Sequence, residues 1–314
     1  MISIDGEVWT FEEIAPGEAH CHRVVETIHT ARSEFQRVEV CRTESYGRGL
    51  FLDGRIQHVE ADEYVYSESL VHPAMTLLGG SARRVLCVGA GPGGAVRELL
   101  AYPGVGEVVQ VEIDTTVLDV AREHLPHSAA ASNAADPRFT LRVRDALDYL
   151  TEGGEPFDLV VNDLSEPFPG SPAARLFGPE ALRAVRARLT PGTGLYVSWC
   201  GSAGPRSSGM AARICRNVRA VFGHCRPYLV HTQSYGTVWL NVIGSTTPFD
   251  PLARSADQID NQLARTLRGS TRLYDGVTHH HMFHLPKDVR ETLATAPEDA
   301  DEPVELAVSV RSTP

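Results

Sequence analysis

Apolar and polar side chains alternate between about residues 35 and 40, and the turn-rich segments 46–49 and 52–55 separate the short apolar stretches that follow. Alternation with a period of two, interrupted by glycine and aspartate turns, is typical of antiparallel hairpins. Residues 62–78 then carry Tyr66, Leu70 and Met75 at a loosely helical spacing. We therefore predict a small antiparallel β-domain with a helical connector over residues 1–78.

From residue 84 short apolar stretches alternate with helical patterns. Strands alternating with helices indicate a parallel, doubly wound sheet. The segments 226–231 and 238–243 flank Gly236 and predict a terminal antiparallel hairpin. We expect an α/β domain over residues 79–290. The expected strands are 85–88, 108–111, 139–143, 159–161 and 195–199, and the expected helices are 95–100, 117–124 and 179–189.

Composition narrows the classes of partner. The last segment, residues 291–314, is acidic and contains proline, which predicts a disordered tail. A net charge of −11 argues against nucleic acid as a partner and suits a cationic substrate. The N-terminus lacks a basic and apolar leader, and no apolar run approaches the roughly 18 residues of a membrane helix. Six cysteines without C-x-x-C spacing indicate reduced thiols, so we expect a cytoplasmic protein that does not enter a membrane.

A glycine-rich turn carries the first chemical signal. Gly89, Gly91 and Gly94 form G-x-G-x-x-G between a predicted strand and a predicted helix, where glycines let the backbone approach a ligand. Glu112 ends the next strand, where its carboxylate can accept hydrogen bonds from two ribose hydroxyls. Together these residues predict a nucleoside ligand without identifying it.

Carboxylates also follow the next two strands. Asp145 ends the third strand, and Asp163 and Glu166 follow the fourth. Because ligands of an open α/β sheet sit outside the carboxyl ends of the strands, these acids and Glu112 should converge on one crevice. Such a crevice would repel the pyrophosphate of a dinucleotide but would accommodate a sulfonium and an ammonium. Each acid could alternatively cap a helix or lie in a solvated turn.

With these motifs the chain resembles the spermidine synthase family, the polyamine aminopropyltransferases, from about residue 35 to residue 286. The resemblance implies the fold class: an α/β protein with a Rossmann-like class I S-adenosylmethionine-dependent transferase sheet, preceded by a small antiparallel β-domain that mediates contacts in a homodimer. The matching segments are Gln36, 46–48, 52–57, 62–66, 88–94, 97–98, 112–114, Asp145, 163–167 and 274–286.

The resemblance also implies roles for individual residues. Asp163 would orient and deprotonate the attacking amine, since an ammonium has no lone pair, and Tyr66 and Tyr235 would line the acceptor pocket. Glu166, Ser67 and Trp199 are further candidates for substrate binding, although Trp199 could equally be a core residue. The expected donor-binding residues are Gln36, Gly89, Gly91, Pro92, Gly94, Glu112 and Asp145.

Three positions depart from the family pattern. Pro92 stands where the family has an acid that pairs with the ammonium of the transferred group, Ser67 replaces a glutamine, and Glu166 is one methylene longer than the usual aspartate. Loss of the acid relieves repulsion against a donor that keeps its own carboxylate, so we hypothesise that intact S-adenosylmethionine is accepted. Alternatively, a neighbouring acid such as Glu166 substitutes for the missing one, and the donor is the ordinary decarboxylated form.

The sequence therefore predicts a spermidine synthase-like transferase. It would move an aminopropyl or 3-amino-3-carboxypropyl group from decarboxylated or intact S-adenosylmethionine to a small amine or amino-acid substrate, with Asp163 as base. An N-methyltransferase, an enzyme that cyclises S-adenosylmethionine, and a catalytically silent nucleoside-binding regulatory protein remain as alternatives. The histidines at positions 279–281 and 284 lack a carboxylate partner in a metal motif, so we expect no metal.

Overall fold

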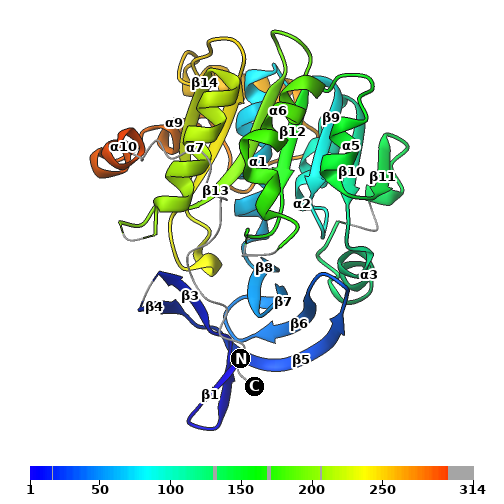
Figure 1. The fold of residues 1–314 in the computed structure, drawn as a ribbon, viewed down its shortest axis with the longest axis vertical. Helices are drawn as coiled ribbons and strands as arrows, with labels where there is room; N and C mark the ends of the chain where they lie inside the picture. Colours follow the sequence, from blue (N-terminus) through cyan, green and yellow to red (C-terminus); the bar gives the residue numbers. More distant parts are fainter. Residues whose placement is uncertain (16, 130–132, 168–170, 206, 296–314) are drawn as a thin grey trace.

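An antiparallel sheet forms the N-terminal part of the protein (Figure 1). The structure is a computed structural model that describes residues 1–15, 17–129, 133–167, 171–205 and 207–295. A separate hairpin pairs β3 (Glu12–Ala15) with β4 (Glu18–His20). The strands of the larger sheet, in spatial order, are β1 (Ile2–Ile4), β2 (Glu7–Trp9), β5 (Arg23–Arg32), β6 (Arg37–Thr43), β7 (Gly47–Leu52) and β8 (Arg55–Val59).

The hairpins predicted over residues 35–60 are confirmed, but the strands before residue 35 escaped prediction. The longest of these, β5, pairs with β6 through two register shifts, between Val24 and Glu26 and between Thr27 and His29. Such bulges insert extra residues into a strand and break its alternation of buried and exposed side chains. The hydrophobic pattern of β5 therefore does not show the period of two.

Helix α1 (Glu63–Leu77) leads from this sheet into a second, seven-stranded sheet. Its first five strands are parallel, and β15 pairs antiparallel with β13 and β14, so the predicted doubly wound sheet and terminal hairpin are both confirmed. In spatial order the strands are β11 (Phe139–Val143), β10 (Gly104–Glu112), β9 (Ser81–Gly89), β12 (Leu159–Asp163), β13 (Leu195–Ser202), β15 (Trp239–Ser245) and β14 (His224–Val230).

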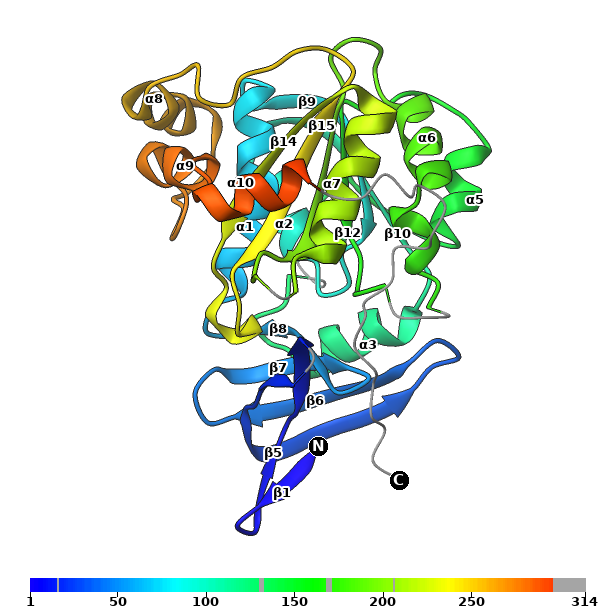
Figure 2. The same cartoon turned by 60° about the vertical axis from the view of Figure 1, so that its left-hand side comes forward.

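Helices cover both faces of the central sheet (Figures 1 and 2). One apolar cluster joins the sheet to α5 (Ala146–Thr151), α6 (Pro179–Arg188) and α7 (Gly209–Phe222). A second joins the other face to α1, α2 (Gly94–Leu100), α8 (Ala256–Thr266) and α9 (Gly276–Phe283). Burial on both faces explains why these strands read as short continuous apolar runs.

Helix α3 (Thr115–His124) connects the two sheets. It packs Val117, Val120 and Ala121 against Val38 and Leu50 of the β-domain. The β-domain therefore lies against the carboxyl ends of β9, β10 and β12 of the central sheet (Figure 2). This arrangement places the predicted functional loops between the two sheets.

The C-terminal part is helical up to the last described residues. In α9, the buried His279 contacts the Tyr274 hydroxyl through Nδ1 at 2.6 Å and the Pro251 carbonyl through Nε2 at 2.8 Å. No group of three or more potential metal ligands gathers within the described residues. Helix α10 (Lys287–Ala294) extends into the first residues of the expected tail, and residues 296–314 lie outside the described part. None of the described helices is long and apolar enough to cross a membrane.

Candidate active site

The glycine turn brings the ends of β9 and β12 and the start of α1 together. Gly89 has a φ of +83°, and a Cβ there would lie 2.3 Å from the carbonyl oxygen of Asp163. That carbonyl accepts a hydrogen bond of 2.8 Å from the Ala90 amide. A Cβ on Gly94 would likewise lie 2.3 Å from the hydroxyl oxygen of Ser67. Both glycines are therefore required by close contact with the neighbouring elements.

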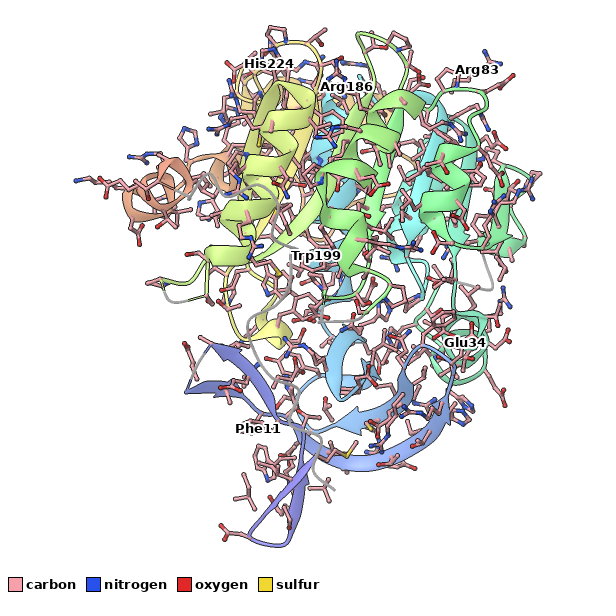
Figure 3. All side chains as sticks on the ribbon, in the orientation of Figure 1. Phe11, Glu34, Arg83, Arg186, Trp199 and His224 are labelled. Carbon is pink, nitrogen blue, oxygen red and sulfur yellow. The ribbon has the colours of Figure 1, made fainter. Side chains whose placement is uncertain are left out.

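One cavity lies between the β-domain and this edge of the central sheet. Trp199, labelled in Figure 3, lies on the side of the α/β domain that faces the β-domain. The cavity brings together every site residue predicted from the sequence: Gln36, Tyr66, Ser67, Gly89, Gly91, Pro92, Gly94, Glu112, Asp145, Asp163, Glu166, Trp199 and Tyr235.

Asp163 and Tyr66 form the central pair of the cavity. The Tyr66 hydroxyl donates a hydrogen bond of 2.6 Å to Oδ1 of Asp163. Burial raises the pKa of Asp163 to about 6, and the hydrogen bond from Tyr66 opposes that rise. Burial and the nearby Asp163 charge raise the pKa of Tyr66 well above its ordinary value, so this hydroxyl remains a donor. A carboxyl group with a pKa near 6 can both hold and release a proton close to neutral pH.

Tyr235 and Trp199 form the aromatic part of the wall. Tyr235 belongs to a single 3-10 turn, η2 (Gln233–Tyr235), and its hydroxyl donates 2.8 Å to the carbonyl of Gln57. Asp62 holds this turn by accepting hydrogen bonds from the amide and hydroxyl of Ser234 at 2.9 and 2.8 Å. Trp199 is buried and also lines the cavity, so it belongs both to the core and to the cavity wall.

Glu112 lies where the ribose of a nucleoside is expected. Its Oε1 accepts the amides of Ile113 and Asp114 at 2.8 and 3.0 Å, and its Oε2 accepts no hydrogen bond from the described residues. Burial raises the pKa of Glu112 to about 7. Gln36 reaches this point from the β-domain, because its side-chain amide donates 2.9 Å to Asp114. Residues of both domains thus form this end of the cavity.

Asp145 has the capping role that the sequence left open. Its Oδ1 accepts the amides of Leu147 and Asp148 at the N-terminus of α5, at 2.8 and 3.3 Å. Its Oδ2 forms an ion pair with Arg175 of the turn η1 (Ala174–Phe177). Both carboxylate oxygens are therefore engaged, and Arg175, the ion-pair partner of this cavity residue, was missed by sequence analysis.

Glu166, at the opposite end, is bound by two residues of β8. Its Oε1 accepts a hydrogen bond of 3.3 Å from Nε of Arg55, and its Oε2 accepts one of 2.9 Å from Gln57. Glu12 of β3 also lines this end; its Oε1 accepts the Ile56 amide at 2.7 Å. Burial raises the pKa of Glu12 to about 8, although the charge of Arg55 opposes the rise. Glu12 and Arg55 were missed because their roles depend on contacts between distant segments.

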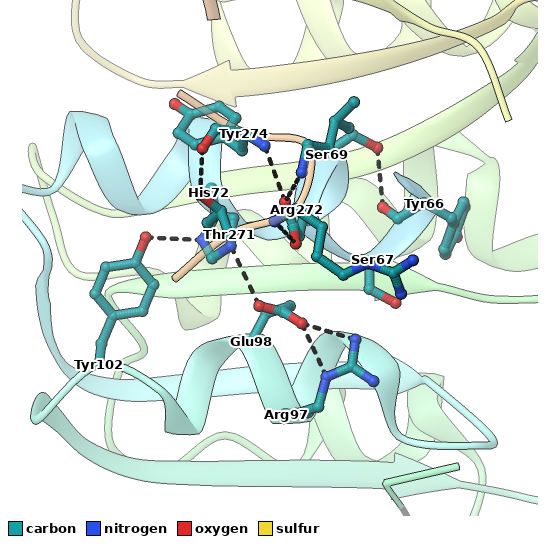
Figure 4. Close-up of polar contacts among 12 residues, drawn as sticks. Tyr66, Ser67, Ser69, His72, Arg97, Glu98, Tyr102, Thr271, Arg272 and Tyr274 are labelled. Atoms are coloured by element: carbon teal, nitrogen blue, oxygen red, sulfur yellow. Dashed lines mark hydrogen bonds and ion pairs between the residues drawn. The ribbon is translucent and has the colours of Figure 1, made fainter. Parts of the chain in front are cut away.

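A polar network joins α1 to α2, the helix that follows the glycine turn, and Figure 4 shows its part from Arg97 through Glu98 and His72 to Tyr102. Arg97 of α2 forms a two-pronged ion pair with Glu63 of α1, with N–O distances of 2.9 and 3.0 Å. Arg97 also contacts Glu98 at 2.7 Å, Glu98 contacts His72 at 3.2 Å, and His72 contacts the Tyr102 hydroxyl at 2.8 Å. Since each pair except Arg97–Glu98 joins different elements, the network fixes α2 against α1.

Comparisons with known proteins agree with this architecture. A spermine/spermidine synthase domain matches residues 63–251, and a spermidine synthase tetramerisation domain matches residues 8–60. Polyamine aminopropyltransferases of Synechococcus sp. and Aeropyrum pernix are 35% and 36% identical to this chain; each alignment covers 91% of it, and 93% and 90% of the respective relative.

Solved structures extend the similarity to the fold. Spermidine synthase from Thermotoga maritima aligns with a TM-score of 0.81 at 25% identity, over 91% of this chain and 94% of the other. A spermidine synthase in complex with the transition state analogue AdoDATO aligns with a TM-score of 0.82 at 25% identity, over 91% and 95%. The expected fold class is confirmed. With matches over both its β-domain and its α/β domain, the chain belongs to the spermine/spermidine synthase family.

Proposed function

We propose that this protein transfers a propyl-type group from an S-adenosylmethionine-type sulfonium to a small amine. The names of its relatives, polyamine aminopropyltransferases, support transfer of that kind. The observation that carries the proposal is the half-buried Asp163–Tyr66 pair. The carbonyl of Asp163 also accepts a hydrogen bond of 2.8 Å from the Ala90 amide of the glycine turn. A base and a nucleoside cradle are thereby held next to each other.

Asp163 would act as the base. The lone pair of the amine nitrogen attacks the carbon bonded to the sulfonium sulfur, and the carbon–sulfur bond breaks with its electron pair remaining on sulfur. The sulfonium becomes the neutral thioether methylthioadenosine, and the proton lost by the amine goes to the Asp163 carboxylate. Tyr66 holds that carboxylate in place through its hydrogen bond. Alignment of nitrogen, carbon and sulfur supplies the remaining rate gain.

The donor nucleoside would occupy the other end of the cavity. The Oε2 atom of Glu112 is available to the ribose hydroxyls, and Gln36 lies beside it through Asp114. The exocyclic amine of adenine would share Asp145 with Arg175 or displace it. The domain limits would be 1–78 for the β-domain and 79–290 for the catalytic domain. We infer that copies of the chain associate through the β-domain, with a homodimer as the smallest unit, since a tetramerisation domain matches residues 8–60.

The products of an incubation test the proposal. The protein would be incubated with intact or decarboxylated S-adenosylmethionine and a panel of diamines and ω-amino acids, and the products identified by mass spectrometry. We expect methylthioadenosine and an acceptor enlarged by a propyl-type group. Asp163→Asn should lower kcat by about 100-fold or more, the usual contribution of a general base. S-adenosylhomocysteine as by-product would instead identify methyl transfer, and donor binding without turnover would support the silent alternative.

A further inference from the structure

Four residues that line the cavity contribute no carboxylate to its wall: Ser67, Gly94, Pro92 and His58. The Ser67 hydroxyl donates 3.2 Å to Glu63, whose carboxylate is already paired with Arg97. Pro92 has no N–H, and its carbonyl accepts hydrogen bonds of 3.1 Å from the Ser128 hydroxyl and the Ala129 amide.

The other carboxylates that line the cavity have hydrogen-bond or ion-pair partners of their own, and Asp53 accepts the Arg37 amide at 2.9 Å. Glu166 is bound by Arg55 and Gln57, so it is not free to replace an acid at the glycine turn. Glu12 accepts the Ile56 amide, Asp145 caps α5 and pairs with Arg175, and Glu112 accepts two amides. Asp163 is the proposed base for the attacking amine, so it is not available to the donor's ammonium. A lone ammonium beside Pro92 would therefore be buried without a counter-charge, which is unfavourable.

His58 supplies the polar group of this wall. Its side chain is 7% exposed and lines the cavity, and its buried Nε2 has no hydrogen-bond partner among the described residues. The ring stacks on His127, with centroids 5.0 Å apart and planes at 7°. Burial lowers the pKa of His58 to about 3, and burial also lowers that of His127, so both rings are neutral at pH 7. A neutral imidazole offers one N–H donor and one acceptor.

We propose that Ser67, Pro92 and His58 form the subsite for the donor's tail, the amine-bearing chain attached to its sulfonium sulfur. This subsite selects intact S-adenosylmethionine over the decarboxylated form. The inference rests on the proposed function, because it assumes a sulfonium donor at the glycine turn. The tail of the intact donor carries both an ammonium and a carboxylate, whose charges compensate each other. His58 can contribute a hydrogen bond to that zwitterion. The decarboxylated tail is a lone ammonium, for which this wall holds no carboxylate.

Binding measured without any acceptor amine tests the selection. Calorimetry would give the dissociation constants of intact donor, decarboxylated donor and methylthioadenosine, which has the nucleoside but not the tail. We expect the wild-type protein to bind the intact donor about tenfold or more tightly than the decarboxylated one. Pro92→Asp should lower this preference by about tenfold or more, because its carboxylate attracts the ammonium and repels the carboxylate. Pro92→Asn is the matched control of equal size without charge, and it should keep the wild-type preference within about threefold.

His58→Leu provides an independent variant. It should weaken binding of the intact donor by about fivefold or more, the size of a lost hydrogen bond, while methylthioadenosine binds as in the wild type. Tighter wild-type binding of the decarboxylated donor would overturn the inference, and so would equal preferences in Pro92→Asp and Pro92→Asn. If Pro92→Asp does not bind methylthioadenosine, the substitution has damaged the nucleoside site and that variant does not test the tail subsite. The wild-type preference between the two donors and the result for His58→Leu then decide whether the inference holds. If the protein binds the decarboxylated donor more tightly and turns it over, the inference fails and the proposed function holds. If it binds the intact donor more tightly but turns over neither donor, the proposed function fails and the inference holds.

Discussion

Removing the Tyr66 hydroxyl should shift the acid limb of the pH–rate profile to higher pH. The hydroxyl donates 2.6 Å to Asp163, and no other described side chain donates to this carboxylate. Its hydrogen bond stabilises the ionised form and so opposes the effect of burial on the pKa of Asp163. Tyr66→Phe keeps the half-buried ring and removes only this bond. The carboxyl group should then hold its proton to higher pH.

The size of the shift follows from the energy of the bond. A hydrogen bond to a charged group contributes about 1.5–3 kcal/mol, and one pKa unit corresponds to about 1.4 kcal/mol. The pKa of Asp163 should therefore rise from about 6 to between about 7 and 8. At pH 6.5 a carboxyl group with a pKa of 6 is about three-quarters ionised, and one with a pKa of 7.5 about one-tenth. Ionisation alone should thus lower kcat/KM roughly eightfold at pH 6.5.

The assay is kcat/KM against pH for the best acceptor amine, since this quantity reports the ionisation of free enzyme and free substrate. Titration of the amine is common to all variants and cancels in the comparison. Tyr235→Phe is the matched control, because its hydroxyl donates to the Gln57 carbonyl and not to a carboxylate. An acid limb that stays in place in Tyr66→Phe, or that moves equally in Tyr235→Phe, would refute the role given to the Tyr66–Asp163 bond.

Two further predictions concern the free protein and the nucleoside end. The melting temperature should fall as the pH rises from about 7 to about 8, because burial raises the pKa of Glu12 and Glu112 in the folded state. At lower pH the buried histidines His22 and His58, whose pKa values burial lowers, act in the opposite direction. A raised pKa means that the folded state holds protons the unfolded state has lost, so this stability is complete below the unfolded pKa and is lost through the folded one. Glu12→Gln should flatten the upper part of this curve in a thermal scan; an unchanged slope would contradict the effect assigned to Glu12. Arg175→Ala should tighten binding of methylthioadenosine by about threefold or more in calorimetry, because Asp145 loses a competing partner, and weaker binding would instead make Arg175 part of the nucleoside site.

Much of the site was predictable because it depends on chain order and strand direction. Glu112 and Asp163 end parallel strands, Asp145 follows another, and parallel strands present their carboxyl ends at one edge of a sheet. The glycine turn was readable because its spacing directly follows β9, and the hairpins of residues 35–60 because their alternation is regular.

The site residues that were not predicted depend on contacts between segments that are distant in the sequence. Arg55 and Glu166 are 111 residues apart in sequence, and Asp145 and Arg175 are 30 apart. No local pattern encodes such pairs, and Glu12 lies on a strand of only four residues, too short to show a period. Their partners, and hence their charge states, follow only from the folded arrangement.

The three raised pKa values have a common consequence for ligand binding. Glu12, Glu112 and Asp163 have pKa values of about 8, 7 and 6, so near neutral pH the empty cavity carries less negative charge than its sequence implies. A sulfonium or ammonium placed among these groups stabilises their ionised forms and lowers their pKa values. Binding of a cationic ligand should therefore release protons, and its affinity should rise with pH between about 6 and 8 until the ligand's own amine begins to titrate. The acids destabilise the free protein in the same pH range in which they favour the ligand. A bound cation thus offsets part of the unfavourable free energy of ionising these buried carboxylates.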